Sequence, residues 1–179
     1  MLPDPLPLTR RVVTGHDAEG RSIIAHDGQS PALLTVERRP GFRNHNIWRT
    51  LGAGASAEAA DTILDHQGVL PPPDGTVLRV IDFPPRPADP AERRRQAASS
   101  LETLFADAVH LSGSEQPGMH RTRTVDYAIV LHGTITAIMD AAETDLRAGD
   151  ILIQRGTNHA WENRTNAMAR VAFILVDAR

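Results

Sequence analysis

The sequence predicts an all-β domain, a sandwich or a barrel made of short strands. The 179 residues include 13 glycines and 13 prolines, which divide the chain into short apolar runs. From Gly118 onward, such runs alternate with turn-forming residues about every eight to twelve positions, a spacing typical of sandwiches and barrels. The length suits a single domain with enough chain to bury a core.

The first half of the chain contains the earlier strands. Residues 11–14 and 22–25 flank the turn-prone segment 16–20, and this pattern predicts a hairpin. The alanine-rich stretch 55–64 is expected to form one or two helical turns or a loop. Further strands are expected at 31–37, 44–50 and 76–82.

A proline-rich connector separates this half from the next. It cannot form regular structure, because proline lacks an amide hydrogen and fixes φ. After it, Asp89 and Pro90 supply an N-cap and a first-turn proline for a helix near 91–105. This segment is either a helix or a mobile flap over a barrel mouth. Arg93, Arg94 and Arg95 follow acidic residues, so they are interpreted as a solvated helix start.

The second half is dense in strand patterns. His132 and Gly133 are expected to form a tight turn between two of these strands. The predicted strands are 125–131, 134–139, 143–147, 151–154, 158–163 and 170–176.

Composition excludes several classes of protein. The chain has no cysteine, which rules out disulfides, thiolate metal sites and thiol nucleophiles. A formal net charge of −3 gives no electrostatic support for nucleic-acid binding. No apolar run approaches the ~20 residues that span a bilayer, and the N-terminus lacks a signal-peptide pattern. We therefore expect a cytoplasmic protein that does not bind membranes.

Two sets of polar residues suggest a pocket. His120, Thr122 and Asp126 share the parity that places strand residues on one face, and His159 and Trp161 do the same. Two imidazoles and a carboxylate that converge in a barrel can hold a divalent metal with open coordination positions. Without a metal, the same groups can transfer protons.

The spacing of these residues resembles the two motifs of the cupin family. His120, Thr122 and Asp126, followed by Gly133, resemble the first motif. The second is resembled by Gly149, Asp150, Gln154, Gly156, His159 and Asn163. Fifteen residues separate Gly133 from Gly149, as in many short microbial members, and the resemblance covers about residues 113–177.

The resemblance implies a cupin-type jelly-roll β-barrel, also called a double-stranded β-helix. The residue patterns of the first half add to it an N-terminal strand extension and a short helix near 91–105. Residues 1–112 would pack on the barrel and residues 113–179 would carry the motifs, in one structural domain. Small cupins often exchange N-terminal strands, so a homodimer is expected.

The sequence departs from the cupin pattern at two ligand positions. Thr122 stands where the family has a second histidine, and Asp126 replaces a longer glutamate. The ligands of a bound metal would be His120, Asp126 and His159, and iron, manganese, zinc and nickel all stay open. Without metal, His120 or His159 would be the general base and Asp126 would orient the imidazole.

Other residues are candidates for substrate binding or for contacts outside the barrel. Thr122 and Trp161 are expected beside the pocket, and Gln154 and Arg155 at its mouth, where Arg155 would favour a carboxylate. Tyr127 should point away from Asp126, towards a second sheet or a dimer partner. The family implies an oxygenase, decarboxylase, isomerase, cyclase or lyase acting on a small carboxylated or aromatic molecule. The alternative is a non-catalytic binding or sensor barrel.

Overall fold

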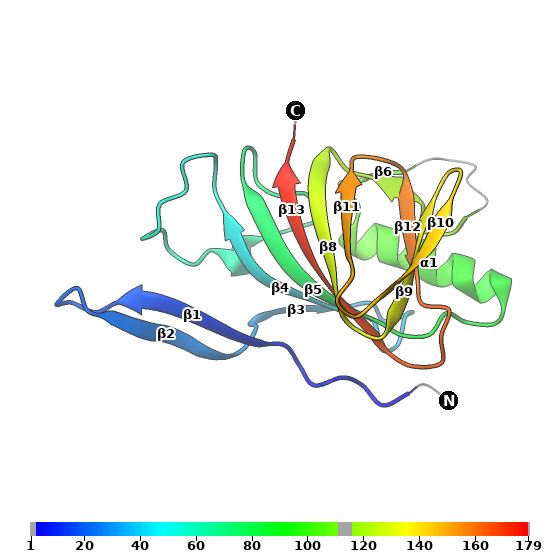
Figure 1. The fold of residues 1–179 in the computed structure, drawn as a ribbon, viewed down its shortest axis with the longest axis horizontal. Helices are drawn as coiled ribbons and strands as arrows, with labels where there is room; N and C mark the ends of the chain where they lie inside the picture. Colours follow the sequence, from blue (N-terminus) through cyan, green and yellow to red (C-terminus); the bar gives the residue numbers. More distant parts are fainter. Residues whose placement is uncertain (1–2, 111–115, 179) are drawn as a thin grey trace.

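The computed structural model describes residues 3–110 and 116–178. They form a β-barrel of two facing antiparallel sheets, from which a two-stranded hairpin projects (Figure 1). The predicted all-β jelly-roll class is confirmed. Within the described residues, no helix is long and apolar enough to cross a membrane.

The larger sheet joins the two halves of the chain. Strands from the first half continue the sheet begun by the motif-bearing half, because β13 pairs with β8 on one side and with β5 on the other. In order, the sheet contains β11 (Ile151–Arg155), β8 (Thr124–His132), β13 (Ala169–Asp177), β5 (Thr76–Phe83), β4 (Arg43–Thr50) and β3 (Ala32–Thr35).

The smaller sheet faces the first across the core. Its central strand, β12, pairs with β9 and β7. In order, it contains β10 (Glu143–Arg147), β9 (Thr134–Met139), β12 (His159–Glu162), β7 (His120–Arg121) and β6 (Val109–His110).

The core lies between the sheets and follows the period-two alternation of strands. In β8, Asp126, Ala128 and Val130 are buried, whereas Tyr127 is exposed on the outer face, as predicted. Aromatic residues fill one end of the barrel. The ring of Phe83 lies edge-on to those of Phe42 and Phe173, with centroids 5.7 and 6.3 Å away, a favourable arrangement for aromatic pairs.

The helix predicted near 91–105 is present as α1 (Pro90–Leu104). The Asp89 side chain accepts a hydrogen bond from the Ala91 amide, 2.9 Å away, and Pro90 occupies the first turn. The stretch 55–64 is mostly without regular structure, and a 3₁₀ turn, η1 (Ile63–Asp65), lies at its end.

The N-terminal segment is attached to the outer face of the larger sheet through Asp82. This buried carboxylate accepts hydrogen bonds from Arg43 and Arg170, whose guanidinium groups also donate to the carbonyls of Leu6 and Pro7. Burial alone would raise the pKa of Asp82, but the neighbouring side chains of His45, Arg170 and Arg43 hold it at about 2. The carboxylate is therefore ionised at neutral pH.

Beyond this anchor, the predicted hairpin is confirmed as β1 (Arg10–His16) and β2 (Ser22–Gln29). It extends away from the barrel as an arm (Figure 1).

Candidate active site

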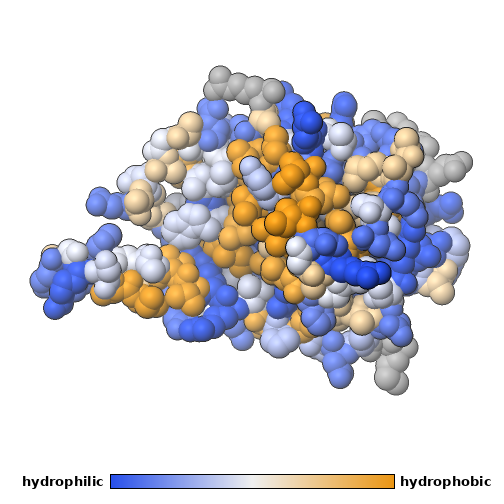
Figure 2. Space-filling view, in the orientation of Figure 1, coloured by the Kyte–Doolittle hydropathy of each residue, from blue (hydrophilic) through white to orange (hydrophobic). Residues whose placement is uncertain are grey.

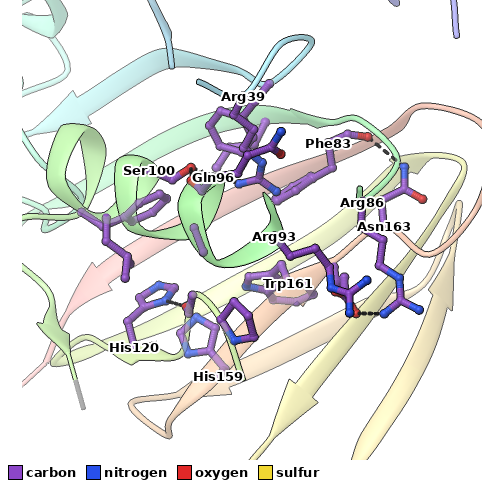
Figure 3. Close-up of a pocket in the computed structure, with 18 of the residues that line it drawn as sticks. Arg39, Phe83, Arg86, Arg93, Gln96, Ser100, His120, His159, Trp161 and Asn163 are labelled. Carbon is purple, nitrogen blue, oxygen red and sulfur yellow. Dashed lines mark hydrogen bonds and ion pairs between the residues drawn. The ribbon is translucent and has the colours of Figure 1, made fainter. Parts of the chain in front are cut away.

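A cavity of about 110 Å³ lies inside the barrel, between the two sheets and beneath α1. Its walls combine aromatic and proline side chains with polar and charged groups (Figure 3). An enclosed cavity that joins apolar walls with convergent polar groups is the usual form of a small-molecule site. His120, Thr122, Asp126, His159 and Trp161, all predicted from the sequence to belong to the pocket, line it.

His120 and His159 are brought together by strand pairing. They occupy directly opposed positions of β7 and β12, so their side chains leave the sheet on the same face. Their ring centroids are 4.5 Å apart, and both residues are buried, with 8% and 4% of their surface exposed. The sequence could show their parity but not this pairing.

The backbone fixes the tautomer of both imidazoles. Nδ1 of His120 lies 2.8 Å from the Gly118 carbonyl, and Nδ1 of His159 lies 3.0 Å from the Thr157 carbonyl. A carbonyl can only accept, so each Nδ1 carries the hydrogen and donates it. In the neutral rings, each Nε2 is therefore left with a free lone pair.

Both rings are neutral at pH 7. Burial, together with the neighbouring His120 ring, lowers the pKa of His159 to about 4. Burial also lowers the pKa of His120. The site thus contains two adjacent unprotonated Nε2 atoms, the state in which imidazole accepts a proton or binds a metal.

Asp126 belongs to the opposite wall. It lies on β8 in the larger sheet, whereas both histidines are in the smaller sheet. Its Oδ1 is enclosed and has no hydrogen-bond partner among the described residues. Burial raises the pKa of Asp126 to about 6, against the lowering effects of Thr124 and Arg79.

This placement corrects one predicted role. The backbone carbonyls of Gly118 and Thr157, not Asp126, orient the two imidazoles.

The residues present do not fit the three-ligand metal site that the motifs suggest. A ligating histidine usually donates the N–H of its second ring nitrogen to a carbonyl or carboxylate, and His120 and His159 both meet that condition. The third ligand is missing, however. Among residues 3–110 and 116–178, no three histidine or acidic side chains lie close enough together to hold one ion. The aspartate lies across the barrel, and its side chain is one methylene shorter than glutamate.

Two other predicted pocket residues have structural partners. Thr122 shares a hydrogen bond of 2.6 Å with Thr124. The ring of Trp161 packs edge-on between those of His159 and Phe173, at centroid distances of 6.1 and 5.2 Å.

Gln154 and Arg155 do not line the cavity. Both border a separate hollow that also includes residues of β9 and β10. The Gln154 amide donates to the Thr157 carbonyl, 2.8 Å away, which ties β11 to the turn before His159. Arg155 has the opposite parity on β11 and is exposed.

Four arginines that sequence reasoning did not place in the pocket line it instead. The prolines around Arg86 and the acidic residues near Arg93 favoured a solvated connector and helix start. Those local signals do not reveal which elements fold over the barrel mouth. The four residues are Arg39, Arg79, Arg86 and Arg93.

Comparison with known proteins identifies the family. Residues 108–176 match the family described as "Cupin domain". "Phomopsin biosynthesis cluster protein C'" of Diaporthe leptostromiformis is 30% identical, over 94% of this chain and 78% of its own. The chain belongs to the cupin superfamily.

Other relatives of this cupin are named as oxidoreductases. The "Cupin-domain-containing oxidoreductase srdD" of Neurospora crassa is 38% identical over 98% of this chain and 80% of its own. The "Cupin-domain-containing oxidoreductase fogC" of Aspergillus ruber is 28% identical over 93% of this chain and 71% of its own. The similarity to these relatives therefore extends beyond the motif-bearing half.

Proposed function

We propose that this cupin is a biosynthetic enzyme that removes and returns a proton on a small organic molecule held in the barrel. The observation that supports this most strongly is the pair of buried, neutral imidazoles, each with its Nδ1 hydrogen donated to a backbone carbonyl. The free Nε2 of His120 or His159 would take a proton from an acidic C–H bond of the substrate. The same imidazolium would then return a proton to the resulting carbanion or enolate.

Three features of the cavity support a base at this position. The backbone carbonyls hold both rings in one orientation, and fixed geometry is a requirement of efficient proton transfer. Burial keeps the rings unprotonated at neutral pH. The two rings are 4.5 Å apart, and this closeness disfavours protonation of both at once, so only one ring would carry the abstracted proton.

The relatives provide the biosynthetic context. One is named as a biosynthesis cluster protein and others as oxidoreductases. Proton removal next to a carbonyl is a step that isomerisation, cyclisation and redox reactions share. Proton transfer of this kind is therefore consistent with the names of the relatives, and it is compatible with more than one net reaction.

Exchange of substrate hydrogen with solvent tests this function. Small aromatic ketones, aldehydes and 2-oxo acids with acidic C–H bonds would be screened for binding by calorimetry. Each binder would then be incubated with the protein in D₂O, and loss of the C–H signal followed by NMR. We expect exchange with at least one binder, slowed roughly 10²- to 10⁴-fold in His159→Gln or His120→Gln. Exposed His132, replaced in the same way, is the matched control and should leave the rate unchanged.

Two results would contradict the proposal. One is exchange at the wild-type rate in the double variant His120→Gln, His159→Gln. The other is binding without exchange for every compound, which would indicate a non-catalytic binding barrel. Oxygen consumption in the same samples, lost with the same variants, would indicate an oxygenase instead.

A further inference from the structure

The charge of the cavity lining is opposite in sign to that of the whole chain. The chain has a formal net charge of −3, yet the acidic side chains of the lining, Asp126 and Glu162, are outnumbered by its four arginines. Glu162 is already paired with Arg86, 2.7 Å away. We infer that the cavity binds an organic carboxylate and that Arg39 is the residue that pairs with it.

Arg39 is held in place without a charged partner. Its guanidinium carbon lies 4.3 Å from the centroid of the Phe42 ring and 5.8 Å from that of Phe83. Stacking of this kind fixes the guanidinium plane and leaves its N–H edge available for an acceptor. Its one hydrogen bond to a described side chain is a long contact of 3.4 Å with the Ser100 hydroxyl.

Among the described residues, no acidic side chain forms an ion pair with Arg39, although the charge of Glu162 acts on it at longer range. Across residues 3–110 and 116–178, none lies within ion-pair distance of its guanidinium. Burial lowers the pKa of Arg39 to about 10, so it stays charged at neutral pH. Arg39 is half-buried, and a bound carboxylate would supply it with a counter-ion through two parallel hydrogen bonds.

Arg93 adds positive charge at the same opening. It extends from α1, and its Nη1 donates to the carbonyls of Pro87 and Ala88, 3.1 and 3.0 Å away. Figure 3 shows it beside Trp161, with Arg39 farther along the same space near Gln96 and Ser100. The two arginines come from segments far apart in the sequence and border one cavity.

Arg79 adds positive charge to the interior of the barrel, which the charges of Asp107 and Asp126 offset in part. Its Nη2 donates to the carbonyls of Val69 and Gly68, but its Nε and Nη1 have no partner among the described residues. Because Arg79 is only 1% exposed, it would act on a ligand mainly through its electrostatic field. In a medium of low dielectric, that field favours an anion over a neutral molecule of the same shape.

The remaining walls define the body of the ligand. Trp161, Phe105 and Phe173 line the cavity together with the two histidines. Aromatic walls favour a flat, apolar ring. The ligand class is therefore a ring-bearing monocarboxylate, and this assignment rests on the proposed function in taking the cavity as the substrate site.

Paired probes of matched shape test the assignment. Binding of benzoate and of neutral benzamide to the full chain would be measured by calorimetry. We expect benzoate to bind at least about tenfold more tightly. Arg39→Gln should remove this preference, and Arg39→Lys should restore part of it, because lysine retains the charge but not the two-pronged geometry. Arg38→Gln, which removes the same charge one residue away and outside the lining, should change benzoate affinity less than twofold.

The ratio of the two affinities is the decisive readout. Simple misfolding in Arg39→Gln would weaken both probes together, and circular dichroism would reveal it. Equal affinity for benzoate and benzamide in the wild type, or no binding of benzoate at millimolar concentration, would overturn the inference. So would an undiminished preference for benzoate in correctly folded Arg39→Gln. None of these results depends on turnover, so this inference and the proton-transfer proposal fail separately.

Discussion

At the scale of single residues, the backbone around each histidine decides its chemistry. Gly118 and Thr157 each precede a histidine by two positions, and their carbonyls accept the Nδ1 hydrogen. Nothing in the side-chain sequence specifies this contact, because it depends on the path of the chain into β7 and β12. Sequence spacing could therefore locate His120 and His159 in the pocket, while their tautomer required the structure.

Asp126 provides a prediction about pH and stability. Its pKa is about 6 in the folded chain and about 3.8 when exposed, so folding favours the protonated form. The stabilising contribution of that form is fully present below about pH 4 and is lost as pH rises through about 6. Asp126→Asn should therefore unfold at higher denaturant concentration than the wild type near pH 8. The advantage there should exceed that near pH 4 by roughly 1–3 kcal/mol.

Denaturant unfolding of both proteins at the two pH values measures this effect. The substitution of an amide for the carboxyl group can also change stability independently of pH. Subtracting the stability difference at pH 4 from that at pH 8 removes this contribution. If the difference between variant and wild type is the same at both values, Asp126 does not titrate as described.

At the scale of secondary structure, local signals predicted the elements well. The Asp89–Pro90 pair marks the start of α1, and alternation identifies β5, β8 and β13. Local signals do not predict which sheet each strand joins, because that depends on pairing between segments that are distant in the sequence. Asp126 and His120 belong to the same motif but lie in opposite sheets, which explains why the predicted three-ligand set is not assembled. The sequence likewise did not indicate Arg39 and Arg93, whose positions depend on how the turn before β4 and the helix α1 meet the barrel.

At the scale of the whole molecule, the outer face of the larger sheet is unusually apolar. Tyr127, Leu131, Ile151 and Ile153 are exposed on β8 and β11, and Figure 2 shows a broad hydrophobic area over this part of the molecule. Exposed patches of this kind usually mark interfaces.

We propose that this face is covered by a second copy of the chain. The β1–β2 arm extends away from its own barrel (Figure 1) and exposes apolar residues of its own, Val12, Ile23 and Ile24. An apolar arm that projects from the body is suited to pack on the apolar sheet of a partner.

Light scattering coupled to size-exclusion chromatography tests the homodimer. We expect the mass of two chains for the wild type and of one chain for Ile153→Arg, because a guanidinium in an apolar interface has no partner. Leu64→Arg, which changes a more exposed apolar residue elsewhere on the molecule, should remain dimeric. A monomeric wild type, or a dimer that Ile153→Arg leaves intact, would contradict this arrangement.

The central claim is that His120 and His159 are neutral and carry their hydrogen on Nδ1, which leaves two free Nε2 atoms in the cavity. Nitrogen NMR of the ¹⁵N-histidine-labelled protein reports this state directly, with signals assigned from His120→Gln and His159→Gln. We predict that both rings show a protonated Nδ1 and an unprotonated Nε2 at pH 7, and that His159 stays so until the pH approaches about 4. An imidazolium at pH 7, or a hydrogen on Nε2 of either ring, would contradict the account.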